Sequence, residues 1–216
     1  MEQSFLFIGL ILSYLLGSIP NAVWVGKLMF GIDVREHGSG NAGATNTFRV
    51  LGKRAGFLVL ILDFLKGLAS AALLLFQDNL IPGTAEFRNY QMLFGITSVI
   101  GHVYPIFAGF RGGKGIATLL GVVVGISWYV AAICALVFIL TVWASKYISL
   151  GSMIACIVSP LVVRLIYGAN ESIFIYFCAA VAIMVLYTHR TNLKRLKEGT
   201  ETKFSFSKKP EIESSK

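Results

Sequence analysis

Long apolar runs separated by short polar segments dominate the chain. A helix needs about 20 residues to cross a bilayer, and runs near or above that length lie at roughly 4–28, 55–76, 91–109, 116–145, 148–168 and 172–188. The pattern predicts an all-α polytopic membrane bundle that occupies residues 1–201. The remaining segment, 202–216, is polar, and we expect it to be a disordered cytoplasmic tail.

The run at 116–145 decides the number of spans. It is longer than one crossing needs, and Gly125, Ser127 and Trp128 near its middle would allow a break into two helices. Basic residues gather in three segments, at 27–54, 111–114 and 190–216. The positive-inside rule places all three on the cytoplasmic side. Seven spans and five both satisfy this, and both leave the N-terminus outside; we favour seven.

Composition supports a membrane protein and argues against nucleic acid as a partner. Of the 216 residues, 56% are hydrophobic and only 14% are charged, against about 25% charged in soluble domains. The net charge of +8 comes mainly from the segments between and after the apolar runs. Outside those segments there is no basic face with interleaved aromatics, which is the pattern that binding to nucleic acid would need. The three cysteines lie inside apolar runs, and no pair has zinc-ligand spacing, so we expect no metal site and no disulfide framework. The N-terminal apolar run has no basic residue before it, which predicts a retained span rather than a secretory signal.

A first polar cluster runs from Ser39 to Asn46 and is followed by Arg49. Glycines and small residues let several backbone N–H groups converge on an anion, and a helix that begins near Ala42 would add partial positive charge. The alternative is an ordinary Gly/Asn loop between spans. We interpret the cluster as a candidate phosphate site.

A second cluster, Phe110 to Thr118, surrounds Lys114 with three glycines. It is not a nucleotide P-loop, because Ala108 stands where that motif begins with Gly and Gly115 replaces the Ser or Thr after the lysine. Backbone amides and an ammonium can still face an oxyanion. The alternative is a short basic loop between helices.

A third cluster follows the last apolar run. If that helix continues, His189, Asn192 and Arg195 recur three residues apart and share one face. A basic stop after the last span is the alternative, although it explains neither His189 nor Asn192. Inside the membrane, Asp63 and Lys66 are three residues apart and can face each other; we favour a structural ion pair for them.

The three clusters resemble the signature motifs of the bacterial acyl-phosphate:glycerol-3-phosphate acyltransferase family (PlsY). The strings are SGNAGATNTFR at 39–49, GGKGIAT at 112–118 and HRTNLKRLKEGTE at 189–201, with GSIP at 17–20, DFLKG at 63–67 and GHVYP at 101–105. Their order and spacing match too, and the resemblance covers residue 5 to about 201.

The resemblance implies a seven-helix enzyme of the bacterial inner membrane, with its active site facing the cytoplasm. It would transfer a fatty acyl group from acyl phosphate to glycerol 3-phosphate, giving lysophosphatidic acid and phosphate in the first acylation step of phospholipid synthesis. Its substrates are then acyl phosphate and glycerol 3-phosphate, with membrane lipid around it, no cofactor, and a functional link to the soluble enzyme that forms acyl phosphate.

The matching positions give the expected site. The expected catalytic residues are Ser39, Lys114, His189 and Asn192. The expected substrate-binding residues are Gly40, Asn41, Gly43, Asn46, Arg49, Gly112, Gly113, Gly115, Thr118, Arg195 and Glu201.

Two alternatives to this function exist. The His-x4-Asp pair of other glycerolipid acyltransferases is excluded, because Ala42, Phe107 and Lys194 stand five residues after the three histidines. An organic-phosphate transporter or exchanger would also use basic loops and an intramembrane ion pair. A transporter places its anion site near the bilayer midplane, whereas these clusters are all predicted at one surface.

Overall fold

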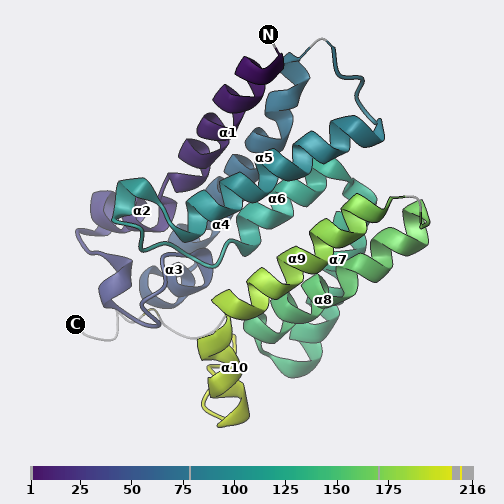
Figure 1. Cartoon of the computed structure of the whole chain (residues 1–216). Coiled ribbons are helices and arrows are strands. Elements are labelled where there is room, and N and C mark those ends of the chain that lie inside the picture. The colour runs from purple at the N-terminus through teal and green to yellow at the C-terminus, as the bar shows by residue number, and fades with distance from the viewer. Residues whose placement is uncertain (1, 78, 170, 206–209, 211–216) are drawn as a thin grey trace. The chain divides into compact units, whose positions relative to one another are not determined.

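The computed structural model describes residues 2–77, 79–169, 171–205 and 210, and all regular elements among them are helical (Figure 1). The α-helices are α1 (Glu2–Ser18), α2 (Asn21–Phe30), α3 (Ala44–Leu51), α4 (Lys53–Ala72), α5 (Ala85–Val103), α6 (Ile116–Ile126), α7 (Trp128–Ser145), α8 (Ile148–Tyr167), α9 (Ser172–Thr188) and α10 (Arg190–Lys197). Three short 3-10 turns are η1 (Val34–Glu36), η2 (Leu73–Phe76) and η3 (Ile106–Ala108). The expected all-α class is confirmed.

The chain divides into two compact units. One contains α1 to α6, and the other is Ser127–Ser205, which contains α7 to α10. The boundary is the break expected within the run at 116–145. Here α6 ends at Ile126, and Ser127 caps α7 by accepting a hydrogen bond from the Val130 amide through its side chain. Most of the tail expected to be disordered lies outside the described residues.

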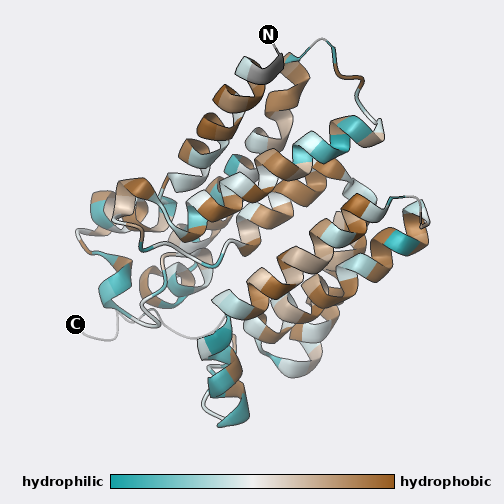
Figure 2. Cartoon of the chain, in the orientation of Figure 1, coloured by the Kyte–Doolittle hydropathy of each residue, from teal (hydrophilic) through white to brown (hydrophobic). Residues whose placement is uncertain are grey.

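Several helices suit a membrane by length and composition. Four described helical stretches are long and apolar enough to cross one: Lys53–Phe76, Ala85–Ala108, Trp128–Ser145 and Ile148–Tyr167. Two bent pairs, α1 with α2 and α9 with α10, would raise the number to six, and α6 is a shorter apolar helix. Figure 2 shows mostly hydrophobic colours on α1 and α7 and hydrophilic colours on α10. The seven-span count stays a prediction.

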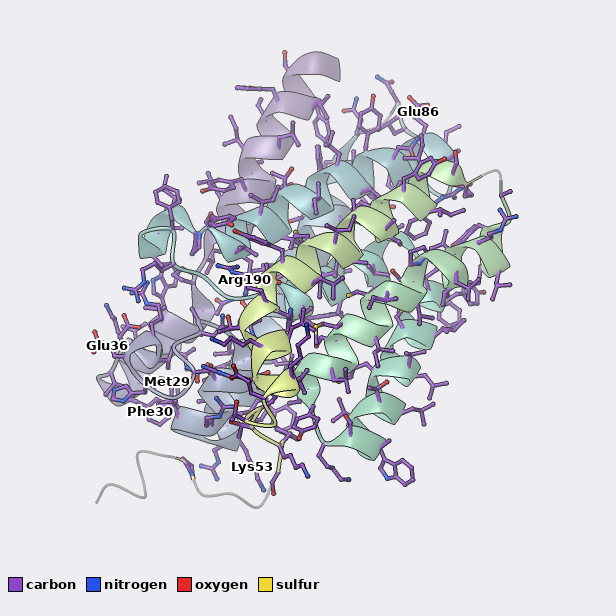
Figure 3. All side chains as sticks on the ribbon, turned by 60° about the horizontal axis from the view of Figure 1, so that its bottom comes forward. Met29, Phe30, Glu36, Lys53, Glu86 and Arg190 are labelled. Carbon is purple, nitrogen blue, oxygen red and sulfur yellow. The ribbon has the colours of Figure 1, made fainter. Side chains whose placement is uncertain are left out.

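Small residues let the helices of the first unit approach closely. A Cβ on Gly67 or Gly121 would strike backbone atoms of the partner across the α4–α6 contact, and one on Gly17 or Gly101 would do so across the α1–α5 contact. This is how membrane helices pack, since lipid supplies no hydrophobic drive for their association. Lys53 and Glu86, at the starts of α4 and α5, lie at opposite ends of the unit (Figure 3), so α4 and α5 run antiparallel.

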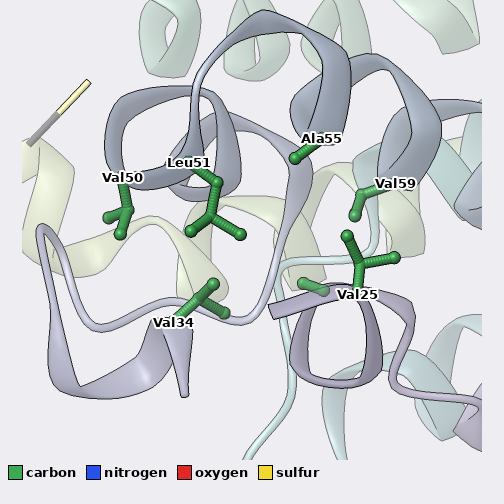
Figure 4. Packing of buried hydrophobic residues seen from close by; sticks show 7 residues of the cluster. Val25, Val34, Val50, Leu51, Ala55 and Val59 are labelled. Atoms are coloured by element: carbon green, nitrogen blue, oxygen red, sulfur yellow. The ribbon is translucent and has the colours of Figure 1, made fainter. Parts of the chain in front are cut away.

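An apolar cluster supports the segment that leads into the first polar motif. Residues from α2, η1, α3 and the start of α4 pack together in it (Figure 4), and its buried members are Ala22, Val25, Val34, Val50, Leu51, Ala55 and Val59. The amphipathic α3 contributes Val50 and Leu51 to the cluster. The cluster therefore fixes α3, and with it the loop that precedes α3, on the end of α4.

Candidate functional site

The segment at 37–43, called here the first loop, is held together by Asn46. The Asn46 Oδ1 accepts hydrogen bonds from the Ser39 amide at 2.8 Å and from the Ser39 Oγ at 3.0 Å. Its Nδ2 donates to the carbonyl oxygens of Val34 and His37 at 2.8 and 3.1 Å. The Asn46 side chain is buried, and these bonds occupy both of its polar atoms. Asn46 thus shapes the loop and fixes Ser39.

The first loop presents backbone N–H groups at the start of α3. That helix begins at Ala44, two residues later than expected, and its N-cap Gly43 makes no side-chain capping bond. The first-turn N–H groups and the helix dipole favour an anion there. Gly38 and Gly40 adopt positive φ, and the Cδ of Arg49 lies 3.4 Å from where a Cβ of Gly38 would stand. The Arg49 side chain therefore runs along this loop.

The segment at 104–115, called the second loop, lies against the first. The Gly112 and Gly113 amides donate to the carbonyl oxygens of Val103 and His102, each at 3.2 Å. A Cβ on Gly113 would overlap His102 Nε2 and lie 3.0 Å from the carbonyl oxygen of Ala42. The first two motifs are therefore neighbours in the folded chain, and Lys114, half-buried, follows at this junction.

Gly113→Ala should lower activity by disturbing this junction. The added methyl group would push against the His102 ring and the Ala42 carbonyl, and overpacking of this kind typically costs about 1–3 kcal/mol. We expect a raised KM for the phosphorylated substrates, measured by steady-state kinetics on detergent-solubilised protein. Unchanged KM and kcat would show that the two loops need not meet so closely.

Beneath the two loops lies a buried ionic cluster that joins three helices, α2, α4 and α5. Asp63 Oδ1 accepts from Asn21 Nδ2 at 2.9 Å and pairs with Lys66 Nζ at 3.0 Å, with His102 Nδ1 3.6 Å away. Lys66 also donates to the carbonyl oxygen of Ile19 at 2.8 Å. The expected Asp63–Lys66 pair is confirmed. Asn21 and His102 extend it to α2 and α5.

The hydroxyl of Thr118 connects this cluster to the second motif. It lies 3.2 Å from His102 Nδ1, and Thr118 has no exposed surface. A cavity of about 10 Å³, the size of one water molecule, is lined by Asp63 and Lys66 of the cluster and by Ala42 and Gly113 of the two loops. The ionic cluster therefore lies next to both loops, on their buried side. The Thr118 hydroxyl is next to this cluster, and the expected role of Thr118 in substrate binding stays a prediction.

The third motif belongs to the second unit, where His189 marks a bend. The last apolar helix does not continue through this motif, because α9 ends at Thr188 and α10 turns away by 63°. His189 is buried, and its Nδ1 lies 2.9 Å from the carbonyl oxygen of Val185. A carbonyl only accepts, so Nδ1 carries a proton and donates it to the Val185 oxygen.

Glu201 ties the third motif to the start of α8. Its Oε1 accepts from Asn192 Nδ2 and from Ser149 Oγ, each at 2.6 Å. Gly199 adopts positive φ, and the amides of Thr200 and Glu201 donate to the Arg195 carbonyl, which turns the chain back after α10. Asn192 is thereby fixed in the first turns of α10. The backbone of Arg195 takes part in this turn.

The placements separate the expected site residues into three groups. Those at the junction of the first two loops are Ser39, Gly40, Asn41, Gly43, Arg49, Gly112, Gly113, Lys114 and Gly115. Those of the second unit are His189, Asn192, Arg195 and Glu201. Asn46 and Thr118 are buried beneath the loops, with their side chains bonded inside the protein.

Four residues with evident roles here were not among the expected site residues. Asn21 and His102 complete the ionic cluster, Ser149 binds Glu201, and Arg35 reaches across to the second loop. Polar residues inside apolar runs were the available signal for Asn21, His102 and Ser149. Their partners are distant in sequence, so spacing could not identify them.

Comparison with known proteins identifies the family of this chain. The glycerol-3-phosphate acyltransferase family profile matches residues 7–199. A glycerol-3-phosphate acyltransferase of Bacillus cytotoxicus is 48% identical over 93% of this chain and 96% of its own length. One from Chlorobium phaeobacteroides is 38% identical, over 92% and 96%.

Solved structures show the same fold. The crystal structure of PlsY, an integral membrane glycerol 3-phosphate acyltransferase, in its glycerol 3-phosphate form matches with a TM-score of 0.82 and 38% identity, over 93% of this chain and 96% of that one. Its lysophosphatidic acid form matches with a TM-score of 0.80 and 37% identity. The expected polytopic membrane bundle is confirmed. The chain is a member of the glycerol-3-phosphate acyltransferase family.

Proposed function

We propose that this protein transfers a fatty acyl group from acyl phosphate to the hydroxyl of glycerol 3-phosphate. The observation that carries the proposal is the junction of two glycine-rich loops in the first unit, where the Ala42 carbonyl lies against Gly113 and Lys114 follows. Such a junction offers backbone N–H groups and cationic side chains to phosphate. The family's name and the glycerol 3-phosphate and lysophosphatidic acid forms of PlsY support the acceptor and the product.

The chemistry needs positioning more than it needs a strong base. The acceptor oxygen forms a bond to the acyl carbon while the bond from that carbon to the phosphate oxygen breaks. Phosphate leaves and takes the hydroxyl proton, so atoms and charge balance. Because acyl phosphate is a mixed anhydride with a good leaving group, the protein's task is to hold two anions together and align the hydroxyl.

The residues divide between the two substrates. We assign the backbone from Gly40 to Gly43, together with the first turn of α3 from Ala44 to Asn46, to the phosphoryl group of acyl phosphate. Ser39 is assigned to a hydrogen bond with one substrate. Arg49 and Lys114 would bind glycerol 3-phosphate through charge-assisted hydrogen bonds. Asn46 acts by fixing Ser39, and Thr118 acts by holding His102 of the ionic cluster next to the second loop.

His189 and Asn192 orient the acceptor in this proposal. The hydrogen bond from Nδ1 to the Val185 carbonyl fixes the ring of His189, and we assign the fixed ring to alignment of the acceptor hydroxyl. Asn192 is held by Glu201 through one of its amide hydrogens. We infer that Glu201 positions Asn192 instead of contacting the reacting atoms.

A direct assay tests this function. Purified protein is incubated with a long-chain acyl phosphate and labelled glycerol 3-phosphate, and we expect labelled lysophosphatidic acid. Label that accumulates inside sealed proteoliposomes without any lipid product would instead favour the organic-phosphate transporter. Product formed only from acyl-CoA or an acyl carrier protein would remove acyl phosphate as the donor.

Transfer should be direct, without an acyl-enzyme intermediate. The Ser39 hydroxyl donates to an amide oxygen, Asn46 Oδ1 at 3.0 Å, which is too weak a base to activate it. Incubation with radiolabelled acyl phosphate alone, quenched in acid, should leave the protein unlabelled. Stoichiometric label that glycerol 3-phosphate chases into product, and that Ser39→Ala abolishes, would overturn direct transfer.

We further propose that the protein lies in the inner membrane with all three motifs cytoplasmic and the N-terminus outside, where it uses acyl phosphate from a soluble enzyme. The basic residues near the motifs support this orientation. Single cysteines replacing Glu36, which is exposed (Figure 3), and Gly199 should both react with an impermeant thiol reagent only from the cytoplasmic face. Reaction of the two from opposite faces would contradict the topology.

A further inference from the structure

Arg35 connects the segment that precedes the first loop to the second loop. It lies in η1, just before the first loop, and its guanidinium binds Asp33 with two arms: Nε donates to Oδ1 at 3.0 Å and Nη2 donates to Oδ2 at 2.7 Å. The third nitrogen, Nη1, donates to the carbonyl oxygens of Ala108 at 2.8 Å and Arg111 at 3.4 Å. One side chain therefore connects η1 to the apex of the second loop.

The pair is well suited to be a fixed anchor. Two parallel N–H···O bonds set the direction of the guanidinium as well as its place, and the Arg35 and Asp33 side chains are only 16% and 10% exposed. Hydrogen bonds from Arg35 hold the pKa of the Asp33 carboxyl well below its ordinary value. A lowered folded-state pKa means that the stabilisation is complete above about pH 4 and is lost only as pH falls through the lowered pKa. The anchor is thus intact at every pH at which the enzyme would be assayed.

The segment that Arg35 holds needs an anchor. Phe110 lies between the two carbonyls and adopts φ +59°, a conformation that costs a non-glycine residue free energy and persists only where the surroundings enforce it. Gly109, Gly112, Gly113 and Gly115 give the same segment high conformational freedom. Without the guanidinium, the second loop would sample other conformations and carry Lys114 with it.

We propose that Arg35 is a positioning residue for acyl transfer: by binding Asp33 and the carbonyls of Ala108 and Arg111, it fixes Lys114 relative to the first loop. The proposal rests on the function proposed above. The charge of Arg35 is already neutralised by Asp33, so Arg35 acts through the loops and does not itself contact a phosphate group.

Kinetics of three variants test the role. Misplacement of a binding group by about 1 Å can cost on the order of a hundredfold, so Arg35→Gln should lower kcat/KM for glycerol 3-phosphate roughly ten- to hundredfold. Arg35→Lys keeps the charge but cannot bind Asp33 and two carbonyls at once, and should recover only part of the loss. The matched control is Lys27→Gln, which removes a cation 3.5 Å from the same carboxylate but is largely exposed; its kcat/KM should stay within about twofold of wild type.

Two further measurements separate positioning from a general loss of stability. In a Lys114→Ala background, Arg35→Gln should lower kcat/KM by less than about threefold, because the group it places is already gone. Hydrogen exchange of the 104–115 peptide should accelerate in Arg35→Gln, and that of the 44–51 peptide should not. An active wild type with unchanged kinetics in Arg35→Gln, or fully additive losses with a lowered Tm, would overturn the proposal. A wild type that makes no lysophosphatidic acid would instead refute the function itself.

Discussion

Lys114→Ala should lower kcat/KM for glycerol 3-phosphate by roughly 30- to 900-fold. Truncating one partner of a partly buried, charge-assisted contact costs about 2–4 kcal/mol, and each 1.36 kcal/mol is about tenfold in rate. The loss should lie mainly in KM, because the ammonium binds phosphate before and during transfer. Lys114 is half-buried at the junction of the two loops, so solvent screens it less than a surface lysine.

The matched control is Lys53→Ala, which removes the same group from an exposed position at the start of α4 (Figure 3). It should leave kcat/KM unchanged. Arg49→Ala should resemble Lys114→Ala, and Arg49→Lys should recover only part of the loss, because lysine lacks the planar fork of arginine. Full activity of Lys114→Ala at low substrate would refute the assignment of Lys114 to phosphate.

His189→Ala should lower kcat by about a hundredfold or more, with a smaller change in KM. The ring is buried and held by the Val185 carbonyl, so its loss removes the group that aligns the acceptor hydroxyl, and alignment of reacting groups can account for large factors in rate. The measurement is kcat at saturating concentrations of both substrates, for wild type and variant.

Two substitutions separate orientation from base catalysis at this position. His189→Gln places an amide near the position of Nε2, whereas His189→Asn can imitate only the Nδ1 end of the ring. If His189 orients the hydroxyl, Gln should recover more activity than Asn. Equal and complete loss in both variants would favour a proton-transfer role. His37→Gln, at an exposed histidine, is the control and should behave like wild type.

The amino-acid sequence by itself determined the helical class and the local chemistry. Apolar runs of bilayer length became α4, α5, α7 and α8, because a helix that satisfies its own backbone is the structure that such runs can form in lipid. The i, i+3 spacing of Asp63 and Lys66 was sufficient to predict their pairing, since neighbours on one helix face meet whatever surrounds them. The glycine-rich segments likewise became loops with positive φ at Gly38, Gly40 and Gly115.

Only the tertiary structure decided which polar residues of the motifs are exposed and which are buried and support the loops through hydrogen bonds. Asn46 and Thr118 stand within the motifs like their neighbours, yet both are buried, because helix packing turns them toward Ser39 and His102. The 63° bend between α9 and α10 was likewise not contained in the apolar pattern, which predicted only that the apolar run ends at residue 188.

The contacts that fix the site join positions far apart in the chain. Asn21 and Asp63 are 42 residues apart, Arg35 and Ala108 are 73 apart, and Ser149 and Glu201 are 52 apart. Periodicity and motif spacing report on neighbours within a few residues of each other, so they carry no information about such pairs. These pairs form only when helices that are separate in sequence have packed. The motifs indicated which chemical groups the site contains, and packing decided where those groups lie.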